Sequence, residues 1–454
     1  MLRLARPEEN PDVSPEYQAG STRRDPAGQG RAWQQQRQRQ QLGLIVTVLV
    51  ALVLGVIIWM VPSPSSSSGD HRASEQRLTA AVKASPRHTT LSRAPSTTAT
   101  AASPPAQGLP AGAAGSPTDQ LRLSLIDTIG GPISPKSVAA SGTGLVFAQN
   151  MMYRHSVTIY GSNGALVRTI PDTVDLTQLG VSGHPGLSKG APVEAAFTPD
   201  ARYAYVSNYS MYGAGFGPEG NDNCTPASAR AAGDTDSYVY RIDTASLTID
   251  QAVQVGLVPK FVAVSPDGKY LLVANWCSYD LSVVDTASAK EVARLPVGAY
   301  PRGLAISPDS STAYVAIMGG NSVVKVNLAT LTRIGSFYVG ANPRHLVLDP
   351  SGRYLYVSLN GSGTAVKVDL TSDRVVGSAR TGSDERSMAI SADGLSLYVV
   401  NYLSNTVTKL RAADMAVLQT VSTGVHPIGA TYDRKTGNVW VAVYSGQILV
   451  FADR

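Results

Sequence analysis

Five glycines recur at a spacing of 42 residues in the C-terminal half of the chain: Gly256, Gly298, Gly340, Gly382 and Gly424. The segments between them repeat one pattern, for example the run "AYPRGLAISPDSSTAYVAIMGGNSVVKVNLATLTRIGSFYVG" that ends at Gly340. A fixed period of this length indicates a repeat architecture, in which each unit buries its apolar surface against the next unit.

Each repeat contains four short apolar runs without helical periodicity. After Gly298 these runs are "RGLAIS", "TAYVAI", "SVVKVNL" and "RIGSFYV". In most repeats a turn such as "SPDG" at Ser265–Gly268 separates the first two runs, and Asp before Gly is typical of tight turns between antiparallel strands. Four antiparallel strands per repeat predict the blade of a β-propeller.

A marker position shortly after each repeat glycine predicts where the innermost strand of a blade begins. Six of these positions hold proline and one holds glutamate: Pro135, Pro192, Pro259, Pro301, Pro343, Glu385 and Pro427. We therefore predict an all-β, seven-bladed propeller over residues 119–454. The last blade has only three strands, and residues 121–129 resemble an unpaired fourth strand. We expect this strand to complete the last blade and to close the ring.

The N-terminal part of the chain has a different composition. Residues 1–41 are polar and are expected to be a disordered tail. Residues 42–61 carry no charge and are long enough to cross a bilayer, so we predict an uncleaved transmembrane helix. The alternatives are a buried core helix and a cleaved signal peptide. Residues 62–118 are rich in Ser, Thr, Pro and Ala and predict a flexible stalk.

The distribution of charge predicts the orientation and excludes one class of partner. Five arginines lie within the 20 residues before the apolar segment, whereas Arg72 and Arg77 follow it. The positive-inside rule then places the N-terminus in the cytoplasm and the propeller outside the cell membrane. Residues 119–454 carry 26 basic and 26 acidic side chains, so the net charge of +5 arises in the N-terminal part. The folded region has no excess of positive charge for nucleic acid.

The second apolar run shares a recurrent spelling in several repeats. Examples are "YAYVSNYS" (203–210), "YLLVANWCS" (270–278) and "LYVVNYLSNTVTKL" (397–410). With the strand starts, this spelling resembles the YVTN-repeat β-propeller family, in particular its bacterial extracytoplasmic members. The resemblance covers roughly residues 132–454 and implies seven blades. The resemblance leaves the function open. Proteins with this repeat are similar to surface-layer components, to periplasmic binding propellers and to lactonase-type propellers. The chain departs from the pattern at Ile317 and Val443, where other repeats carry Asn.

Two insertions, at residues 171–190 and 211–236, lengthen loops on the face where the inner strands begin. Long loops are commonly functional, so we predict that the rim of blades 1–3 contacts a protein or an anionic ligand; the alternative is decoration. Cys224 lies in the second insertion and Cys277 in the equivalent loop of the next blade. We predict a disulfide between them, worth about 3–4 kcal/mol, against the alternative of two free thiols.

The residue after the marker position is basic in five of the seven repeats. These residues are Lys136, Lys260, Arg302, Arg344 and Arg386. At the start of the inner strands they would form a ring near the channel mouth, which suits a carboxylate, a phosphate or an acidic loop. The alternative is that they are solvated or pair with nearby acids such as Glu194, Asp384 and Glu385.

Histidines and aromatic residues add weaker candidates for binding on the same face. The histidines are His155, His184, His345 and His426, and Trp276 is among the aromatic residues that are expected near the rim. Imidazoles can ligate metals or act as bases, and indole rings can stack on a sugar. The alternatives are solvated histidines and aromatic rings that pack between loops.

The sequence favours a binding or scaffolding module over an enzyme. It contains no GxSxG, HExxH or P-loop motif, and we predict no catalytic residue, metal or cofactor. The alternative is a lactonase-like hydrolase at the channel mouth, with Glu194, His345 and His426 as the candidate titratable groups. A structural surface protein without a small ligand is a third reading.

Overall fold

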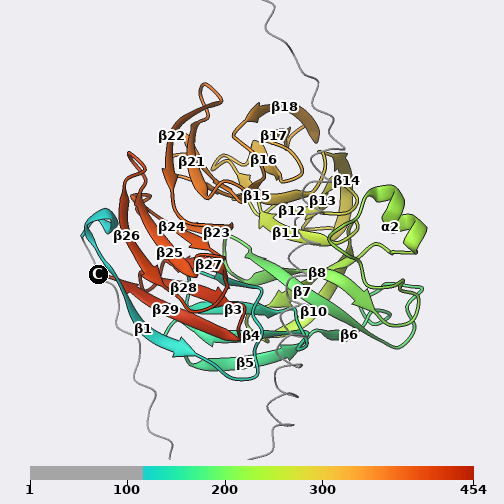
Figure 1. Cartoon of the computed structure of the whole chain (residues 1–454). Coiled ribbons are helices and arrows are strands. Elements are labelled where there is room, and N and C mark those ends of the chain that lie inside the picture. Colours follow the sequence, from blue (N-terminus) through green and yellow to red (C-terminus); the bar gives the residue numbers. More distant parts are fainter. Residues whose placement is uncertain (1–115) are drawn as a thin grey trace, which may run out of the picture. The chain divides into compact units, whose positions relative to one another are not determined.

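Seven antiparallel sheets form a closed ring of blades (Figure 1). The computed structural model describes residues 116–454, and the predicted tail, transmembrane helix and most of the predicted stalk lie outside these residues. Within residues 116–454, no helix combines the length and the apolarity needed to cross a bilayer. The predicted all-β, seven-bladed propeller is confirmed.

The strands of the first four blades follow the repeat. They are β2 (Ser137–Ala140), β3 (Leu145–Asn150), β4 (Ser156–Gly161) and β5 (Leu166–Pro171) in blade 1; β6 (Thr173–Asp175), β7 (Leu187–Phe197), β8 (Tyr203–Tyr212), β9 (Tyr238–Asp243) and β10 (Thr248–Gln254) in blade 2; β11 (Pro259–Val264), β12 (Tyr270–Asn275), β13 (Asp280–Asp285) and β14 (Lys290–Pro296) in blade 3; and β15 (Pro301–Ile306), β16 (Thr312–Ile317), β17 (Ser322–Asn327) and β18 (Thr332–Tyr338) in blade 4.

The other three blades complete the ring. Their strands are β19 (Pro343–Leu348), β20 (Tyr354–Leu359), β21 (Thr364–Asp369) and β22 (Arg374–Arg380) in blade 5; β23 (Glu385–Ile390), β24 (Ser396–Asn401), β25 (Thr406–Arg411) and β26 (Val417–Ser422) in blade 6; and β27 (Pro427–Asp433), β28 (Asn438–Val443), β29 (Gln447–Asp453) and β1 (Leu123–Ile129) in blade 7. The inner strands β2, β7, β11, β15, β19, β23 and β27 contact one another around the centre.

The core lies between the blades, because each sheet packs against two neighbours. In β12 every residue after Tyr270 is buried, whereas the outer strand β14 is exposed or half-buried along its length. Seven clusters of buried apolar residues are each shared by two adjacent blades. For example, Val283 of blade 3 and Val315 of blade 4 belong to one cluster. Since burial stabilises by about 25 cal/mol per Å² of apolar surface, the ring is the folding unit rather than any single sheet.

Buried asparagines explain the recurrent spelling of the second strands. Asn275 donates from Nδ2 to the carboxylate of Asp280 at 2.7 Å, which links β12 to β13. A Cβ on Gly256 would lie 2.7 Å from this amide nitrogen, and a Cβ on Gly382 would lie 2.6 Å from Cγ of Asn401. These two repeat glycines are therefore required by the close approach of the asparagine side chains.

The N-terminal strand closes the ring as predicted. β1 pairs antiparallel with β29 and completes blade 7 (Figure 1, cyan beside red). A fully buried ion pair between Lys409 of β25 and Asp453 of β29 supports this junction. The Lys409 ammonium also donates to the carbonyl oxygens of Thr118 at 2.6 Å and Leu121 at 2.9 Å. Blade 6 thus holds both the beginning and the end of the propeller.

The two faces of the ring differ in their loops. The mouth face carries the loops that lead into the inner strands and the loops between second and third strands. The hairpin face carries the turns between first and second strands, such as Ser265–Gly268. Both insertions lie on the mouth face and include the strand β6 and the extended ends of β7 and β8.

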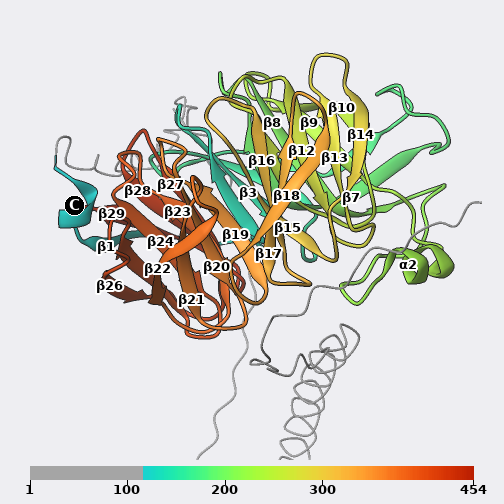
Figure 2. The ribbon, with the colours of Figure 1, turned by 90° about the horizontal axis from the view of Figure 1, so that it is seen from above.

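The second insertion is not the plain loop that the sequence suggested. It contains the short helix α2 (Pro226–Ala232), which Figure 2 shows projecting from the ring. The Thr225 side chain accepts a hydrogen bond from the backbone N–H of Ser228, and Pro226 fills the first helical position. A helix of seven residues is too short to produce a recognisable periodicity, so the pattern of apolar residues gave no sign of it.

We predict that Lys409→Met lowers the free energy of unfolding by about 3–5 kcal/mol, because it leaves the Asp453 carboxylate buried without its cation. Urea unfolding followed by tryptophan fluorescence measures the change. Lys290→Met makes the same substitution at an exposed position of β14 and should cost less than about 0.5 kcal/mol. Equal stability of the two variants would show that the buried pair does not support the closure.

Candidate functional site

The predicted basic residues come together at the end of the channel that lies toward the mouth face. We call the set of Lys136, Lys260, Arg302, Arg344 and Arg386 the basic ring. Each side chain begins at or next to the first residue of an inner strand, so the closed ring of blades brings them to one level. Three of them are buried, with exposed fractions of 6% for Lys260, 5% for Arg302 and 6% for Arg344.

Three cations of the basic ring have carboxylate partners. Lys260 Nζ lies 2.7 Å from Asp222, and Arg302 Nη2 lies 3.3 Å from Glu194. Arg386 Nη2 lies 2.6 Å from Asp384. For these three cations the structure therefore shows the pairing with nearby acids that the sequence analysis gave as the alternative to a binding role.

The other cations of the basic ring lack a carboxylate. Arg344 donates from Nε to the carbonyl oxygen of Arg386 at 3.1 Å and from Nη1 toward the sulfur of Met318 at 3.6 Å. Among residues 116–454, the Lys136 ammonium has neither a hydrogen-bond nor an ion-pair partner, and the buried Nη1 of Arg302 has no acceptor. Hydrogen-bond donors that carry positive charge thus remain unused in a desolvated place.

Burial and mutual repulsion change the titration of the two lysines. The pKa of Lys260 is lowered to about 8, chiefly by burial and also by Arg302 and Arg344, against the opposing effect of Asp222. The pKa of Lys136 is well below its usual value, first because of burial and then because of Arg302 and Arg344. The two lysines therefore hold their protons less strongly than free lysines do.

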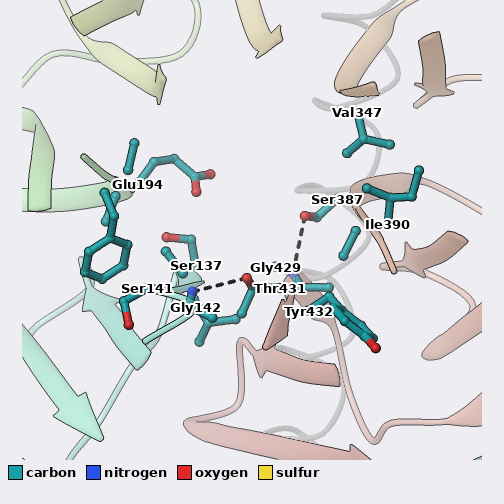
Figure 3. Close-up of a pocket in the computed structure, with 18 of the residues that line it drawn as sticks. Ser137, Ser141, Gly142, Glu194, Val347, Ser387, Ile390, Gly429, Thr431 and Tyr432 are labelled. Carbon is teal, nitrogen blue, oxygen red and sulfur yellow. Dashed lines mark hydrogen bonds between the residues drawn. The ribbon is translucent and has the colours of Figure 1, made fainter. Parts of the chain in front are cut away.

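A cavity of about 440 Å³ occupies the channel next to the basic ring. Six of the seven residues two positions after the markers line it, and Figure 3 shows the Glu194 carboxylate and the Ser137 hydroxyl on its wall. Much of the rest of the wall is formed by small and aliphatic side chains, among them Val347 and Ile390. A ligand of a few heavy atoms fits this space, and Glu194, which lines it, also pairs with Arg302 of the basic ring.

His345 faces this cavity and is neutral at physiological pH. Its ring packs edge to face on Phe261, with 5.0 Å between the ring centroids. Burial, followed by the charges of Arg302 and Arg344, lowers the pKa of His345 to about 3. The sequence assigned His345 to the mouth face with the other histidines, but its position on β19 directs it into the channel.

The remaining predicted site residues lie outside the cavity. His426 stacks on Tyr402, with 4.3 Å between the ring centroids, and the Arg386 guanidinium lies over the same Tyr402 ring at 4.3 Å from its centroid.

Trp276 is buried, packs on Tyr300 with 4.6 Å between the ring centroids and is not exposed on the rim. His155 and His184 pack on Tyr212 and Phe216, respectively, in the insertion region. Within residues 116–454, no three His, Cys, Asp or Glu side chains are grouped to hold a metal ion.

The second insertion is fixed to blade 3 by a disulfide between Cys224 and Cys277, with 5.4 Å between the Cα atoms. Both cysteines belong to a small apolar cluster on the mouth face. The Trp276 Nε1–H donates to the carbonyl oxygen of Asp222 at 3.1 Å, and the Tyr209 hydroxyl donates to the Asp222 carboxylate at 3.2 Å. The insertion thereby places Asp222 against Lys260. The sequence analysis missed Asp222, whose only signal was its place two residues before Cys224.

Comparisons with known proteins give a match to a family model and similar solved structures. Residues 331–446 match the family model of the cytochrome D1 heme domain, from the outer strand of blade 4 into blade 7. Kuenenia stuttgartiensis hydrazine synthase is a similar solved structure, with 20% sequence identity and a TM-score of 0.42. That match covers 57% of this chain and 94% of the hydrazine synthase chain. No curated protein matches the sequence.

The name of the matched family includes a haem, but the channel of this chain does not fit one. His345 faces the cavity, and histidine is a common haem ligand. The inner strands of adjacent blades, however, pack directly against each other, which leaves no room for a macrocycle between two blades. A Cβ on Gly303 would lie 2.7 Å from the carbonyl oxygen of Arg344, and a Cβ on Gly429 would lie 2.9 Å from Cα of Ser137. We therefore assign no haem chemistry to this site.

We predict that the free energy of unfolding rises as the pH is raised from 8 to 10, and that Lys260→Met reduces this rise. The folded chain gives up the Lys260 proton near pH 8, whereas an unfolded lysine holds its proton up to about pH 10.5. The groups that face Lys260 are Asp222, Arg302 and Arg344, with Tyr209 and Trp276 as ring contacts at 4.1 and 5.5 Å.

Urea unfolding of wild type and Lys260→Met over this pH range measures the difference between their slopes. Lys290→Met is the control, because its side chain is exposed. Identical slopes for wild type and Lys260→Met would contradict a depressed pKa of Lys260.

Proposed function

We propose that this protein is a binding propeller whose basic ring receives the anionic group of a ligand. The observation that carries the proposal is the buried Arg302 Nη1, which has no acceptor, beside Arg344, whose hydrogen bonds go to a carbonyl oxygen and a sulfur. Buried cations without counter-charges are unfavourable, so a bound carboxylate or phosphate would stabilise the ring through charge-assisted hydrogen bonds. The adjoining cavity offers space for the remainder of the ligand.

We also propose that residues 42–61 anchor the protein in the cell membrane, with its N-terminus in the cytoplasm and its propeller outside. The uncharged run and the five arginines before it support this topology. The Cys224–Cys277 disulfide supports an oxidising, extracytoplasmic location. The recurrent strand spelling supports membership of the bacterial extracytoplasmic YVTN-repeat propellers, which include binding propellers.

The rim of blades 1–3 is the proposed contact surface for a larger partner of this scaffold. The two insertions extend the mouth face there. The aromatic rings of Tyr209 and Trp276 are buried inside the second insertion. A partner would therefore meet the polar exterior of the insertion and α2 rather than these rings.

A lactonase-like hydrolase is the second candidate, and one observation supports it: Glu194 and His345 line the same cavity. A neutral imidazole or a carboxylate can accept a proton from water beside a bound ester. Hydrolysis of lactones that is lost in Glu194→Gln and in His345→Gln, but kept in His426→Gln, would favour the enzyme. His426 is the comparison because it lies outside the cavity.

Joint replacement of Arg302, Arg344 and Arg386 by Ala tests the binding function. We expect the affinity of the full chain in mild detergent for sulfate, measured by calorimetry, to fall about tenfold or more, because charge-assisted hydrogen bonds are lost. Joint replacement of Arg333, Arg353 and Arg374 by Ala removes three exposed arginines of blades 4 and 5 and should leave the affinity unchanged. Equal affinity in the two triple variants would refute the role of the ring.

A further inference from the structure

Resting on the proposed anion site, we infer that its ligand enters the channel from the hairpin face and is an elongated anion. By this term we mean a molecule with one carboxylate, phosphate or sulfate group and an uncharged, largely apolar body. The charged group meets Arg302 and Arg344 of the basic ring, and the body lies along the inner strands of blades 6, 7, 1 and 2.

The cavity extends from the level just below the basic ring to the hairpin face. Its wall begins two residues after the markers, for example at Ser137 and Glu194, and ends in the hairpin turns at Gly142, Pro199 and Arg434. Pro199 and Arg434 are exposed. Among residues 116–454, no loop of the mouth face contributes to the wall. The cavity therefore opens on the hairpin face.

The burial of the inner strands changes in the same direction. In β11 the first residues, Pro259 and Lys260, are buried, whereas the last ones, Ala263 and Val264, are half-buried. Strands β2, β15 and β19 also begin with two buried residues and end with two half-buried ones, and the last four residues of β7 are half-buried. Since the inner strands run from the mouth face to the hairpin face, water approaches them mainly at their hairpin ends.

Side chains of the basic ring obstruct the other end of the channel. The Arg302 guanidinium of blade 4 contacts Glu194 of blade 2 at 3.3 Å, so it reaches past blade 3. Arg344 of blade 5 contacts Met318 of blade 4 and the carbonyl oxygen of Arg386 in blade 6. Both Arg302 and Arg344 are buried. A ligand from the mouth face would have to separate these contacts.

A ligand from the hairpin face meets the same arginines at the inner end of the cavity. Glu194 lines the cavity and holds the Arg302 guanidinium. His345 also lines it, and burial and then the charges of Arg302 and Arg344 lower the pKa of His345, so both arginines lie near this wall. The buried Arg302 Nη1 has no acceptor, and an anion at this end can accept a charge-assisted hydrogen bond from it.

The wall between the two ends defines the chemistry of the ligand body. Within residues 116–454, the charged side chains of the wall are Glu194 at the inner end and Arg434 at the outer end. Between them the wall presents apolar side chains, which belong to Ala139, Ala195, Phe261, Val347, Met388 and Ile390. A charged group in the middle of the ligand would lose its water there without gaining a partner. An uncharged, largely apolar body fits this wall.

Two hydroxyl groups of the wall link neighbouring blades. The Ser387 hydroxyl accepts a hydrogen bond from the backbone N–H of Ala430 at 3.3 Å, and the Thr431 hydroxyl accepts one from the N–H of Ala140 at 3.2 Å (Figure 3). These bonds join blade 6 to blade 7 and blade 7 to blade 1. The two hydroxyl groups therefore hold the inner strands together, and they do not require a polar ligand body.

The length of the ligand tests the apolar body. Calorimetry at pH 7.5 compares acetate with hexanoate, which has four more methylene groups, for the full chain in mild detergent. Each buried methylene strengthens binding by up to about fourfold, so we expect hexanoate to bind about tenfold or more tightly than acetate. Joint replacement of Arg302, Arg344 and Arg386 by Ala should weaken the binding of both anions, which separates the site from uptake of hexanoate by detergent.

The route of entry is tested with one introduced thiol, because both cysteines of the chain form the disulfide. Ser141→Cys places the thiol in a hairpin turn at the open end of the cavity, and Ser383→Cys places it at an exposed position of the mouth face. Both variants are labelled with pyrene maleimide, a bulky uncharged reagent. Relative to the unlabelled variant, the label should weaken hexanoate binding about tenfold or more in Ser141→Cys and less than about twofold in Ser383→Cys.

The failures of the two proposals are distinguishable. If wild type binds sulfate and acetate but hexanoate binds no more tightly than acetate, the inferred ligand class is wrong and the anion site stands. Equal effects of the two labels, or a loss of binding only in labelled Ser383→Cys, would overturn the hairpin-face route. If neither sulfate nor acetate binds to wild type, the proposed function fails and the inference fails with it.

Discussion

Burial between neighbouring blades is the constraint on which this structure depends, and it is satisfied only when the ring is closed. Most of the apolar core lies between blades, because seven of its clusters are each shared by two sheets. The pairing of β1 with β29 provides the closure. The buried Lys409–Asp453 pair adds a charged contact at this junction, where Lys409 also donates to the carbonyl oxygens of Thr118 and Leu121.

Closure also converts a repeated sequence position into a chemical site. The inner strands begin at one level, so the residues after the marker positions form a layer of cations at one end of the channel. The next residue along six of the seven inner strands contributes to the cavity wall, which includes Ser137, Glu194 and His345. Glu194 joins the two layers, because it lines the cavity and binds Arg302. The chemistry of the centre therefore follows from the strand starts, whereas the outer strands serve packing.

The features that belong to the repeat could be predicted from the sequence. The spacing of Gly256 and its equivalents indicated the repeat, the seven marker positions predicted the number of blades, and the leftover strand at residues 121–129 predicted the closure. The basic ring followed from a single position relative to the marker prolines. Cys224 and Cys277 could be paired because equivalent loops of adjacent blades are neighbours.

The features that lie outside the repeat could not be predicted in the same way. Asp222 reaches Lys260 only because the insertion folds back over blade 3, and α2 is too short to show a periodic pattern. The counting of positions assigned His345 and His426 to one face. It did not show that His345 points into the channel while His426 stacks on Tyr402. Such differences depend on side-chain packing, which a one-dimensional pattern does not contain.

The most direct measurement of the central claim is the location of a heavy dianion in crystals of the full chain. Selenate has the charge and shape of sulfate, and its selenium gives an anomalous signal. The account predicts an anomalous peak at the basic ring, within hydrogen-bond distance of Arg302 Nη1 and of the Lys136 and Arg344 side chains. Selenate bound only elsewhere on the propeller, with the ring free of anion at saturating concentration, would contradict the account.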